Sequence, residues 1–255
     1  FDKISLPPAP HDAGCSIGAV LANNYNNENI FNFSKYKNVN SPYLGRNYSN
    51  DEIRNVFSVL NLSIPKKLND DDLIDFTSTA LIKKNIVAWF NGRDEFGPRA
   101  LGARSILADP RNYNIKDDIN KKIKKRELFR PFAPSVIKEE CGNYFDIKQD
   151  SPYMNIVGNV LKDKIKIIPA ITHIDGTARI HTVSYESNPL YYNLLKKFGE
   201  KTGIPVLLNT SFNIQEPIVR SPTDAIKTFL KSGVNLLVIG NYICDIKWKK
   251  ENMLK

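Results

Sequence analysis

An arginine- and glycine-rich loop directly after a short apolar run is the feature that most constrains this chain. Residues 86–90 (IVAWF) read as a buried strand, and residues 92–105 then carry three arginines, three glycines and one proline. Arginine binds phosphate or carboxylate through paired charge-assisted hydrogen bonds, and glycine lets the backbone come close to a ligand. We therefore interpret the loop as an anion site at the edge of a sheet, in preference to a surface turn with solvated charges.

The charge distribution favours the same interpretation. The formal net charge is +9, and residues 91–130 alone hold eleven Lys or Arg against six Asp or Glu. A local positive field of this kind attracts polyanions. A nucleotide, a phosphorylated metabolite, RNA and an acidic neighbouring domain all remain candidates on this ground.

Composition indicates a globular protein of the cell interior. The 255 residues are 42% hydrophobic, and the mean hydropathy is −0.35. No apolar stretch approaches the roughly 20 residues that span a bilayer. Three scattered cysteines argue against a disulfide framework or a zinc site, so we predict a reducing, cytoplasmic location. The chain begins at Phe1, so we expect its native start to be processed or to lie upstream.

Hydrophobic spacing and capping signals predict an α/β (α+β) fold with a mixed sheet. Small-residue spacing predicts a helix from residue 12, preceded by an extended segment over 4–10 and followed by a linker over 23–47. Further helices are expected from residue 50, over 71–84, 115–125 and 189–201, and from 222. Strands are expected over 86–90, 131–136, 205–208, 236–239 and 242–246, and one or two more over 165–183, interrupted at residues 175–176.

A second cluster of basic residues ends the predicted helix over 115–125. Lys124, Arg126 and Arg130 precede the run Pro-Phe-Ala-Pro, which would fix the position of the arginine before it. The alternative is a basic helix terminus that only complements the helix dipole. We prefer that alternative for Lys121 and Lys122.

A third cluster has the sequence HIDGTAR. In an unbroken strand, alternation would place His173, Asp175, Thr177 and Arg179 on one face. For His173 a structural network and a catalytic role are equally supported, whereas for Arg179 we favour ligand contact.

A fourth cluster, NTSFN, follows the strand over 205–208. Its members Asn209, Ser211 and Asn213 would bring amide and hydroxyl groups to the mouth of an α/β crevice, and a plain turn is the alternative.

Together the clusters resemble the C-terminal half of the O-carbamoyltransferases of nodulation-factor, cephem and tobramycin biosynthesis. The matching motifs are GRDEFGPRALGARSILADPR, IKKRELFRPFAPS, THIDGTARIHTV, and GIPVLLNTSFNIQEPIV followed by SPTDAI. The resemblance implies a YrdC-like twisted mixed β-sheet with flanking helices and a large open cleft over residues 46–255. It also implies that residues 1–45 are the tail of a metal-binding domain of the actin/hexokinase type plus a linker.

The resemblance further implies a two-step reaction. The YrdC-like domain would form carbamoyl adenylate from carbamoyl phosphate and ATP with Mg²⁺, and the metal-binding domain would transfer the carbamoyl group to a hydroxyl of a small-molecule acceptor. The implied catalytic residues are Lys124, Arg130, Arg179 and His173. The implied ATP-site residues are Arg99, Arg93, Arg104, Arg126, Thr177, Asn209, Ser211 and Asn213.

The chain also departs from the family pattern. Asp12 matches a metal ligand of the N-terminal domain, which holds iron or another divalent metal, but the partner ligands are not in this sequence. Ala103 stands where the family often has Asn. We therefore do not expect complete transfer activity from this fragment.

Two alternative functions stay open. A threonylcarbamoyl-adenylate synthase of tRNA modification would share the fold and explain the basic charge by RNA contact. The long GPRALG and HxDGTxR motifs argue against it, and against a nucleic-acid partner. A non-catalytic nucleotide-binding module of a split enzyme is the other alternative.

Overall fold

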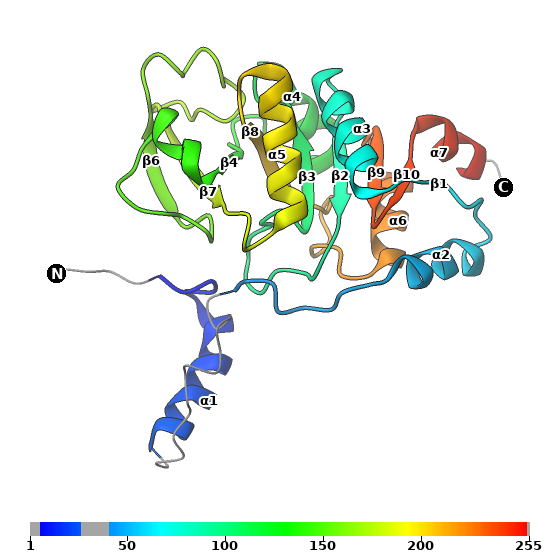
Figure 1. The fold of residues 1–255 in the computed structure, drawn as a ribbon, viewed down its shortest axis with the longest axis horizontal. Helices are drawn as coiled ribbons and strands as arrows, with labels where there is room; N and C mark the ends of the chain where they lie inside the picture. Colours follow the sequence, from blue (N-terminus) through cyan, green and yellow to red (C-terminus); the bar gives the residue numbers. More distant parts are fainter. Residues whose placement is uncertain (1–5, 27–40, 254–255) are drawn as a thin grey trace.

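Apolar strands form the centre of a ten-stranded mixed sheet in the computed structural model, which describes residues 6–26 and 41–253 (Figure 1). In sheet order the strands are β1 (Lys66–Lys67), β10 (Tyr242–Cys244), β9 (Leu236–Ile239), β2 (Val87–Phe90), β3 (Arg104–Ala108), β8 (Val206–Ser211), β4 (Ala133–Ile137), β7 (Thr177–Val183), β6 (Ile156–Val160) and β5 (Phe145–Asp146). The pairs β2–β9 and β4–β7 are parallel, and the other neighbours are antiparallel. The predicted mixed α/β sheet is confirmed.

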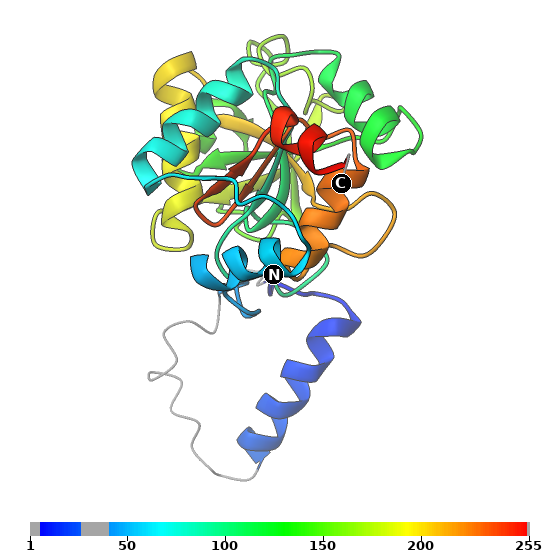
Figure 2. The ribbon, with the colours of Figure 1, turned by 90° about the vertical axis from the view of Figure 1, so that its right-hand side faces the viewer.

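Helices cover both faces of this sheet (Figure 2). In β2, Val87 and Trp89 pack with α3 (Asp70–Ile82) and α5 (Pro189–Thr202), whereas Ala88 and Phe90 pack with α2 (Asn50–Val59) and α6 (Pro222–Lys231). Alternate side chains of a strand point to opposite faces, so one short apolar run serves two cores. The remaining helical elements are α4 (Ile115–Asp118), the π-helical turn Ile119–Lys124, the 3₁₀ turn Lys138–Asn143 and α7 (Ile246–Met253).

Capping residues begin and end the helices where the sequence predicts. In α2 the Ser49 hydroxyl accepts from the Glu52 amide at 3.2 Å, and the Glu52 carboxylate accepts from the Ser49 amide at 2.8 Å. A second such box begins α6 at Ser221, with Pro222 as its first helical residue. Helix α5 ends at Gly203, whose φ of +77° is left-handed.

The prediction of strand over residues 165–183 is wrong for its first half. Only β7 is extended, and residues 162–171 form turns. Ile165 and Ile168 donate backbone bonds to carbonyls four residues earlier, and Ile168 and Ile171 are buried beneath the sheet. The apolar residues of these turns have a spacing that also fits a strand, so the sequence pattern did not distinguish turns from strand. His173 and Asp175 therefore precede the strand instead of sharing a face of it.

Other elements are longer than predicted or were not predicted. Strand β3 begins inside the stretch interpreted as the arginine-rich loop, and β8 continues through Asn209 to Ser211. Strands β5 and β6 and helix α7 were also missed, α7 beginning at the residue where a strand was expected to end. The predicted basic helix over 115–125 is confirmed, as α4 continued by the π-helical turn.

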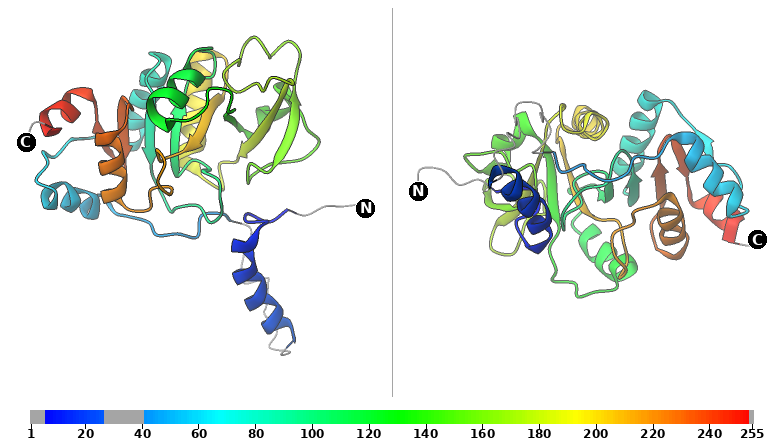
Figure 3. Two further views of the ribbon diagram at one scale, coloured as in Figure 1. Left: turned by 180° about the vertical axis from the view of Figure 1, so that it is seen from behind. Right: turned by 90° about the horizontal axis from the view of Figure 1, so that it is seen from below.

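The described N-terminal residues form the 3₁₀ turn η1 (Asp12–Gly14) and α1 (Cys15–Asn26), which extends away from the sheet (Figure 1 and the left view of Figure 3). The predicted helix from residue 12 is confirmed. The predicted extended segment over 4–10 and the linker over 23–47 lie partly outside the described residues. The boundary at residue 45 stays a prediction. Within residues 6–26 and 41–253, no helix has the length and apolarity of a bilayer-spanning segment.

Gly102 joins the arginine-rich loop to α5. Its φ is +96°, and a Cβ atom built on it would lie 2.1 Å from Cδ1 of Tyr191. Its carbonyl accepts from the Trp89 indole at 3.0 Å, and its amide donates to the Ser105 hydroxyl at 3.0 Å. The position therefore combines a backbone conformation that disfavours side chains with a contact that leaves no room for one.

Substituting Gly102→Ala should lower the free energy of unfolding by about 2–6 kcal/mol, since backbone strain and overpacking each cost about 1–3 kcal/mol. The matched control is Gly92→Ala in the same loop, where φ is +69° but no atom lies within 4 Å of the added Cβ. That variant should lose only the strain, about 1 kcal/mol. Urea unfolding of both variants measures the difference, and equal losses would refute the Tyr191 contact.

Candidate functional site

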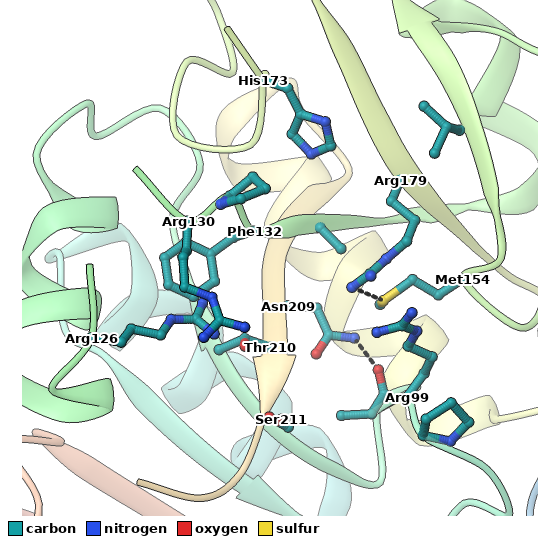
Figure 4. Close-up of a pocket in the computed structure, with 15 residues that line it drawn as sticks. Arg99, Arg126, Arg130, Phe132, Met154, His173, Arg179, Asn209, Thr210 and Ser211 are labelled. Atoms are coloured by element: carbon teal, nitrogen blue, oxygen red, sulfur yellow. Dashed lines mark hydrogen bonds between the residues drawn. The ribbon is translucent and has the colours of Figure 1, made fainter. Parts of the chain in front are cut away.

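Among the described residues, four arginines and no carboxylate line a cavity of about 380 Å³ where β8, β4 and β7 meet the arginine-rich loop (Figure 4). The described lining residues are Pro98, Arg99, Ala100, Arg126, Arg130, Pro131, Phe132, Ala133, Met154, Val157, His173, Arg179, Asn209, Thr210 and Ser211. Seven residues expected at the site from the sequence therefore come together, although they lie up to 112 positions apart. A cationic wall without carboxylates suits a polyanionic ligand.

Arg99 and Arg179 converge on the cavity, and neither donates to a protein oxygen of the described residues. Arg179 extends from β7 and touches Met154 Sδ at 3.7 Å, but its buried Nε has no hydrogen-bond partner among the described residues. Burial, and then the nearby Arg99, lower the pKa of Arg179 to about 10. Two like charges facing one cavity are unfavourable until an anion lies between them.

Arg126 and Arg130 approach the cavity from the segment after the π-helical turn. Arg126 donates to Asn120 Oδ1 at 2.7 Å, and its guanidinium lies 5.0 Å from the centre of the Phe132 ring. Asn120 in turn donates to the Arg130 carbonyl at 3.0 Å. The Arg130 side chain is exposed, and its nearest carboxylate is Glu127 at 4.0 Å. The chain thus holds the backbone of Arg130 in place and leaves its side chain available.

Glu95 shapes the loop that carries Arg99. Its Oε1 accepts from the backbone amides of Leu101 and Ala103, both at 2.7 Å, and of Arg104 at 3.2 Å. Burial raises the pKa of Glu95, while these amides and the Arg104 charge oppose that rise. One carboxylate therefore folds residues 95–104 into a tight bend with Arg99 at its turn.

Arg104 and Arg93 are not brought to the cavity, which departs from the expectation that they contact the nucleotide. Arg104 is fully buried, lies 3.7 Å from the Phe90 ring centre and donates to the Gly92 carbonyl at 3.0 Å. Arg93 donates to the Gly45 carbonyl at 2.8 Å. Both guanidinium groups bind backbone oxygens and so stabilise the loop from its far side. Sequence alone does not distinguish an arginine that binds backbone from one that binds ligand.

Lys124 lies behind the cavity wall and joins two motifs. Its Nζ donates to the Ser211 carbonyl, and to Asn213 Oδ1 at 2.6 Å and the Asn213 carbonyl at 2.9 Å, with Ser211 Oγ at 3.2 Å. The side chain is only 3% exposed. Burial, and then Arg126, lower the pKa of Lys124 to about 7, while Glu216 opposes the change. The lysine thus ties the π-helical turn to the end of β8.

His173 and Thr177 form a small polar group at the start of β7. Thr177 Oγ1 lies 3.1 Å from His173 Nδ1 and donates to Asp175 Oδ1 at 2.7 Å. Burial lowers the pKa of His173, with Asp175 opposing and Arg179 adding to the effect. The imidazole therefore faces the cavity as a neutral group near pH 7.

Ser135 and His181, two buried residues beneath the cavity, were not predicted from the sequence. Asn209 donates through Nδ2 to the Ala100 carbonyl at 3.1 Å and to Ser135 Oγ at 2.9 Å, and Ser135 Oγ lies 2.8 Å from His181 Nδ1. Burial lowers the pKa of His181 to about 3, so its ring is neutral. Their positions inside the FAPS and ARIHTV motifs are the only signal that could have found them.

The predicted metal ligand Asp12 lies exposed in η1. Across the described residues, no group of three or more His, Cys, Asp or Glu side chains is placed to hold a metal ion. All three cysteines are free, Cys15 exposed and Cys141 and Cys244 buried. A metal site that includes Asp12 would need its other ligands from elsewhere.

A family model described as "Carbamoyltransferase C-terminus" matches residues 78–245, which include every residue that lines the cavity. The chain belongs to this family. It is 42% identical to nodulation protein NolO of Bradyrhizobium diazoefficiens over 95% of this chain and 44% of that protein. It is 31% identical to 3'-hydroxymethylcephem-O-carbamoyltransferase of Amycolatopsis lactamdurans over 94% of this chain and 44% of that protein. The predicted family resemblance is confirmed.

The carbamoyltransferase C-terminus fold resembles a solved structure of different sequence. The crystal structure of P. abyssi Sua5 complexed with L-threonine aligns with a TM-score of 0.51 and 12% identity, over 71% of this chain and 50% of that one. This likeness confirms the predicted YrdC-like fold and nothing beyond it. The chain spans less than half the length of the two curated relatives named above.

Titration of Lys124 should make stability depend on pH. The unfolded lysine has a pKa near 10.4, so between about pH 7 and pH 10 the unfolded chain binds more protons and stability rises with pH. Lys124→Met lacks this titration. The advantage of wild type over the variant should therefore grow by up to about 1.4 kcal/mol per pH unit from pH 7 to pH 9. Urea unfolding at both pH values measures it, and a constant difference would contradict the lowered pKa.

Proposed function

We propose that this chain carries out the adenylate-forming step of an ATP-dependent O-carbamoyltransferase. The observation that carries the proposal is the cavity lined by four arginines, of which Arg179 has a buried Nε without a partner among the described residues and donates otherwise only to Met154 Sδ. ATP and carbamoyl phosphate are both polyanions, and joining them requires several fixed positive groups in one place. Membership in the carbamoyltransferase C-terminus family supports carbamoyl as the group transferred.

The step consists of two reactions. Carbamoyl phosphate first loses its phosphate to water, which gives carbamate and inorganic phosphate. A carbamate oxygen then attacks the α-phosphorus of ATP, a new O–P bond forms, and the bond to the β-phosphate oxygen breaks to release pyrophosphate. The product is carbamoyl adenylate. Negative charge increases on the phosphate oxygens during the attack, where preorganised arginines stabilise it.

Each group takes a role that follows from its position. Arg99 and Arg179 lie together and bind the reacting phosphate and carbamoyl oxygens, while Arg126 and Arg130 bind the departing pyrophosphate from the opposite segment. Lys124 supports the site through its hydrogen bonds to Ser211 and Asn213. His173 and Thr177 form a polar pair that closes the cavity where β7 begins. Arg93 and Arg104 stabilise the loop through backbone carbonyls and do not contact the nucleotide.

We propose that metal ions are brought by the substrates or held in a separate domain, and not bound by the residues of the cavity. No carboxylate among the described residues lines the cavity, so Mg²⁺ would arrive bound to the ATP phosphates and the chain supplies no ligand set for it. We propose that transfer to the acceptor hydroxyl takes place in a separate metal-binding domain with iron or another divalent metal, to which Asp12 contributes one ligand. We place the reaction in the cytoplasm.

Pyrophosphate release from ATP, measured with and without carbamoyl phosphate, tests the proposal on the 255-residue chain. Wild type should release pyrophosphate only when both substrates are present. Arg179→Met should lower kcat/KM by about ten- to hundredfold, because a hydrogen bond to a charged group is worth about 1.5–3 kcal/mol. The control Arg54→Met changes an exposed arginine of α2 outside the cavity and should leave the rate unchanged.

Two results would contradict this function. Pyrophosphate release that requires threonine and bicarbonate instead of carbamoyl phosphate would identify a threonylcarbamoyl-adenylate synthase. ATP binding without any pyrophosphate release under either condition would favour a non-catalytic nucleotide-binding module.

A further inference from the structure

Residues 41–46, which we call the strap, lie along the arginine-rich loop and are hydrogen-bonded to it. The Pro42 carbonyl accepts from the Phe96 amide at 2.6 Å, and the Gly45 amide donates to the Asp94 carbonyl at 3.0 Å. The strap precedes the residues that match the carbamoyltransferase family model and belongs to the stretch that the sequence predicts as a linker. The arginine-rich loop is therefore held in part by a segment outside the family domain.

The hydroxyl of Tyr43, in the strap, holds the loop at Leu101. It donates to the Leu101 carbonyl at 2.8 Å, and the Leu101 amide donates to Glu95 Oε1 at 2.7 Å. Both polar backbone groups of Leu101 are thus fixed, two positions after Arg99. Contacts of this kind, made behind the residues that face a ligand, determine how accurately those residues are placed.

The ring of Tyr43 packs against residues of the cavity wall. It contacts a small apolar cluster formed by Leu101, Ala133 and Met154. Ala133 and Met154 line the cavity, and Met154 Sδ lies 3.7 Å from a guanidinium nitrogen of Arg179. Met154 also has a left-handed φ of +54°, a conformation that persists only where the surrounding structure holds it. The ring therefore supports the residue that contacts Arg179.

We infer that Tyr43 is a positioning residue that links the strap to the two facing arginines of the cavity. Its hydroxyl fixes the turn that carries Arg99, and its ring supports Met154 beside Arg179. Tyr43 is not among the described residues that line the cavity, so it acts through these neighbours and not on the ligand. The inference rests on the proposed function and adds a residue from outside the family domain to its site.

The protonation state of Tyr43 suits this role. Burial, and then the Glu95 charge, raise the pKa of the Tyr43 hydroxyl, while a hydrogen bond with Asn188 opposes the rise. The hydroxyl is therefore a donor near neutral pH, and the Leu101 carbonyl can only accept. The substitution Tyr43→Phe thus removes one donor, changes no charge and keeps the ring.

Two variants of the 255-residue chain separate the two contacts. Isothermal titration calorimetry with inorganic phosphate should show about two- to tenfold weaker binding by Tyr43→Phe, the effect of one lost hydrogen bond. Tyr43→Leu also loses the aromatic ring and should bind at least about tenfold more weakly. Pyrophosphate release should show a lower kcat and a higher KM for carbamoyl phosphate in both variants. Urea unfolding checks that each variant folds, and the Tyr43→Phe result stands alone where Tyr43→Leu does not.

The matched control is Tyr144→Phe. The Tyr144 hydroxyl also donates to a backbone carbonyl, that of Gly203 at 3.2 Å, and Tyr144 does not line the cavity. This variant should lose a similar amount of stability in urea and keep the phosphate affinity, the kcat and the KM of wild type. A merely structural role of Tyr43 would give the same result as this control.

The outcomes separate this inference from the proposed function. Unchanged phosphate affinity, kcat and KM in both Tyr43 variants would overturn the role of Tyr43, whatever happens to stability, and leave the adenylate-forming step supported. Weaker phosphate binding by the Tyr43 variants, in a chain whose wild type releases no pyrophosphate, would support the role of Tyr43 and contradict the proposed function. Absence of phosphate binding by wild type would overturn both.

Discussion

The Glu95 carboxylate is the interaction on which the arrangement of the site depends. Three backbone amides converge on one oxygen, which gives residues 95–103 a defined shape without a helix or strand. That shape directs Arg99 into the cavity and sets the Ala100 carbonyl against Asn209. The buried guanidinium of Arg104 binds carbonyls of the same loop, so an acid and a base hold it from within.

The site divides into a fixed floor and a charged rim. The floor is β8 between β3 and β4, where Asn209 is paired on both sides and Thr210 and Ser211 are paired with β3. The rim consists of arginines at loop ends, whose long side chains reach the cavity with few protein contacts. Charge that attracts a ligand and groups that recognise it thus come from different kinds of structure.

Much of the fold could be predicted because its signals are local. The Ser49 and Ser221 capping boxes, the Gly203 terminus and the apolar run of β2 each depend on a few neighbouring residues. The turns over 162–171 could not be predicted, because their isoleucines are buried by segments that are distant in the sequence. The spacing of apolar residues does not show where those segments lie. At the site, residue type predicted Arg99 and Arg179, but it did not separate them from Arg104, because the sequence does not show whether an arginine binds backbone or ligand.

The central position of β8 also determines how readily its backbone amides exchange hydrogen with solvent. An amide in a strand paired on both sides exchanges its hydrogen with solvent only when the sheet opens, which costs close to the whole free energy of unfolding. Loop amides such as those over 96–100 exchange through small local openings. A bound ligand would therefore slow exchange in the arginine-rich loop and leave β8 almost unaffected. Hydrogen exchange of the β8 amides would report on global stability, and exchange of the loop amides would report on ligand binding.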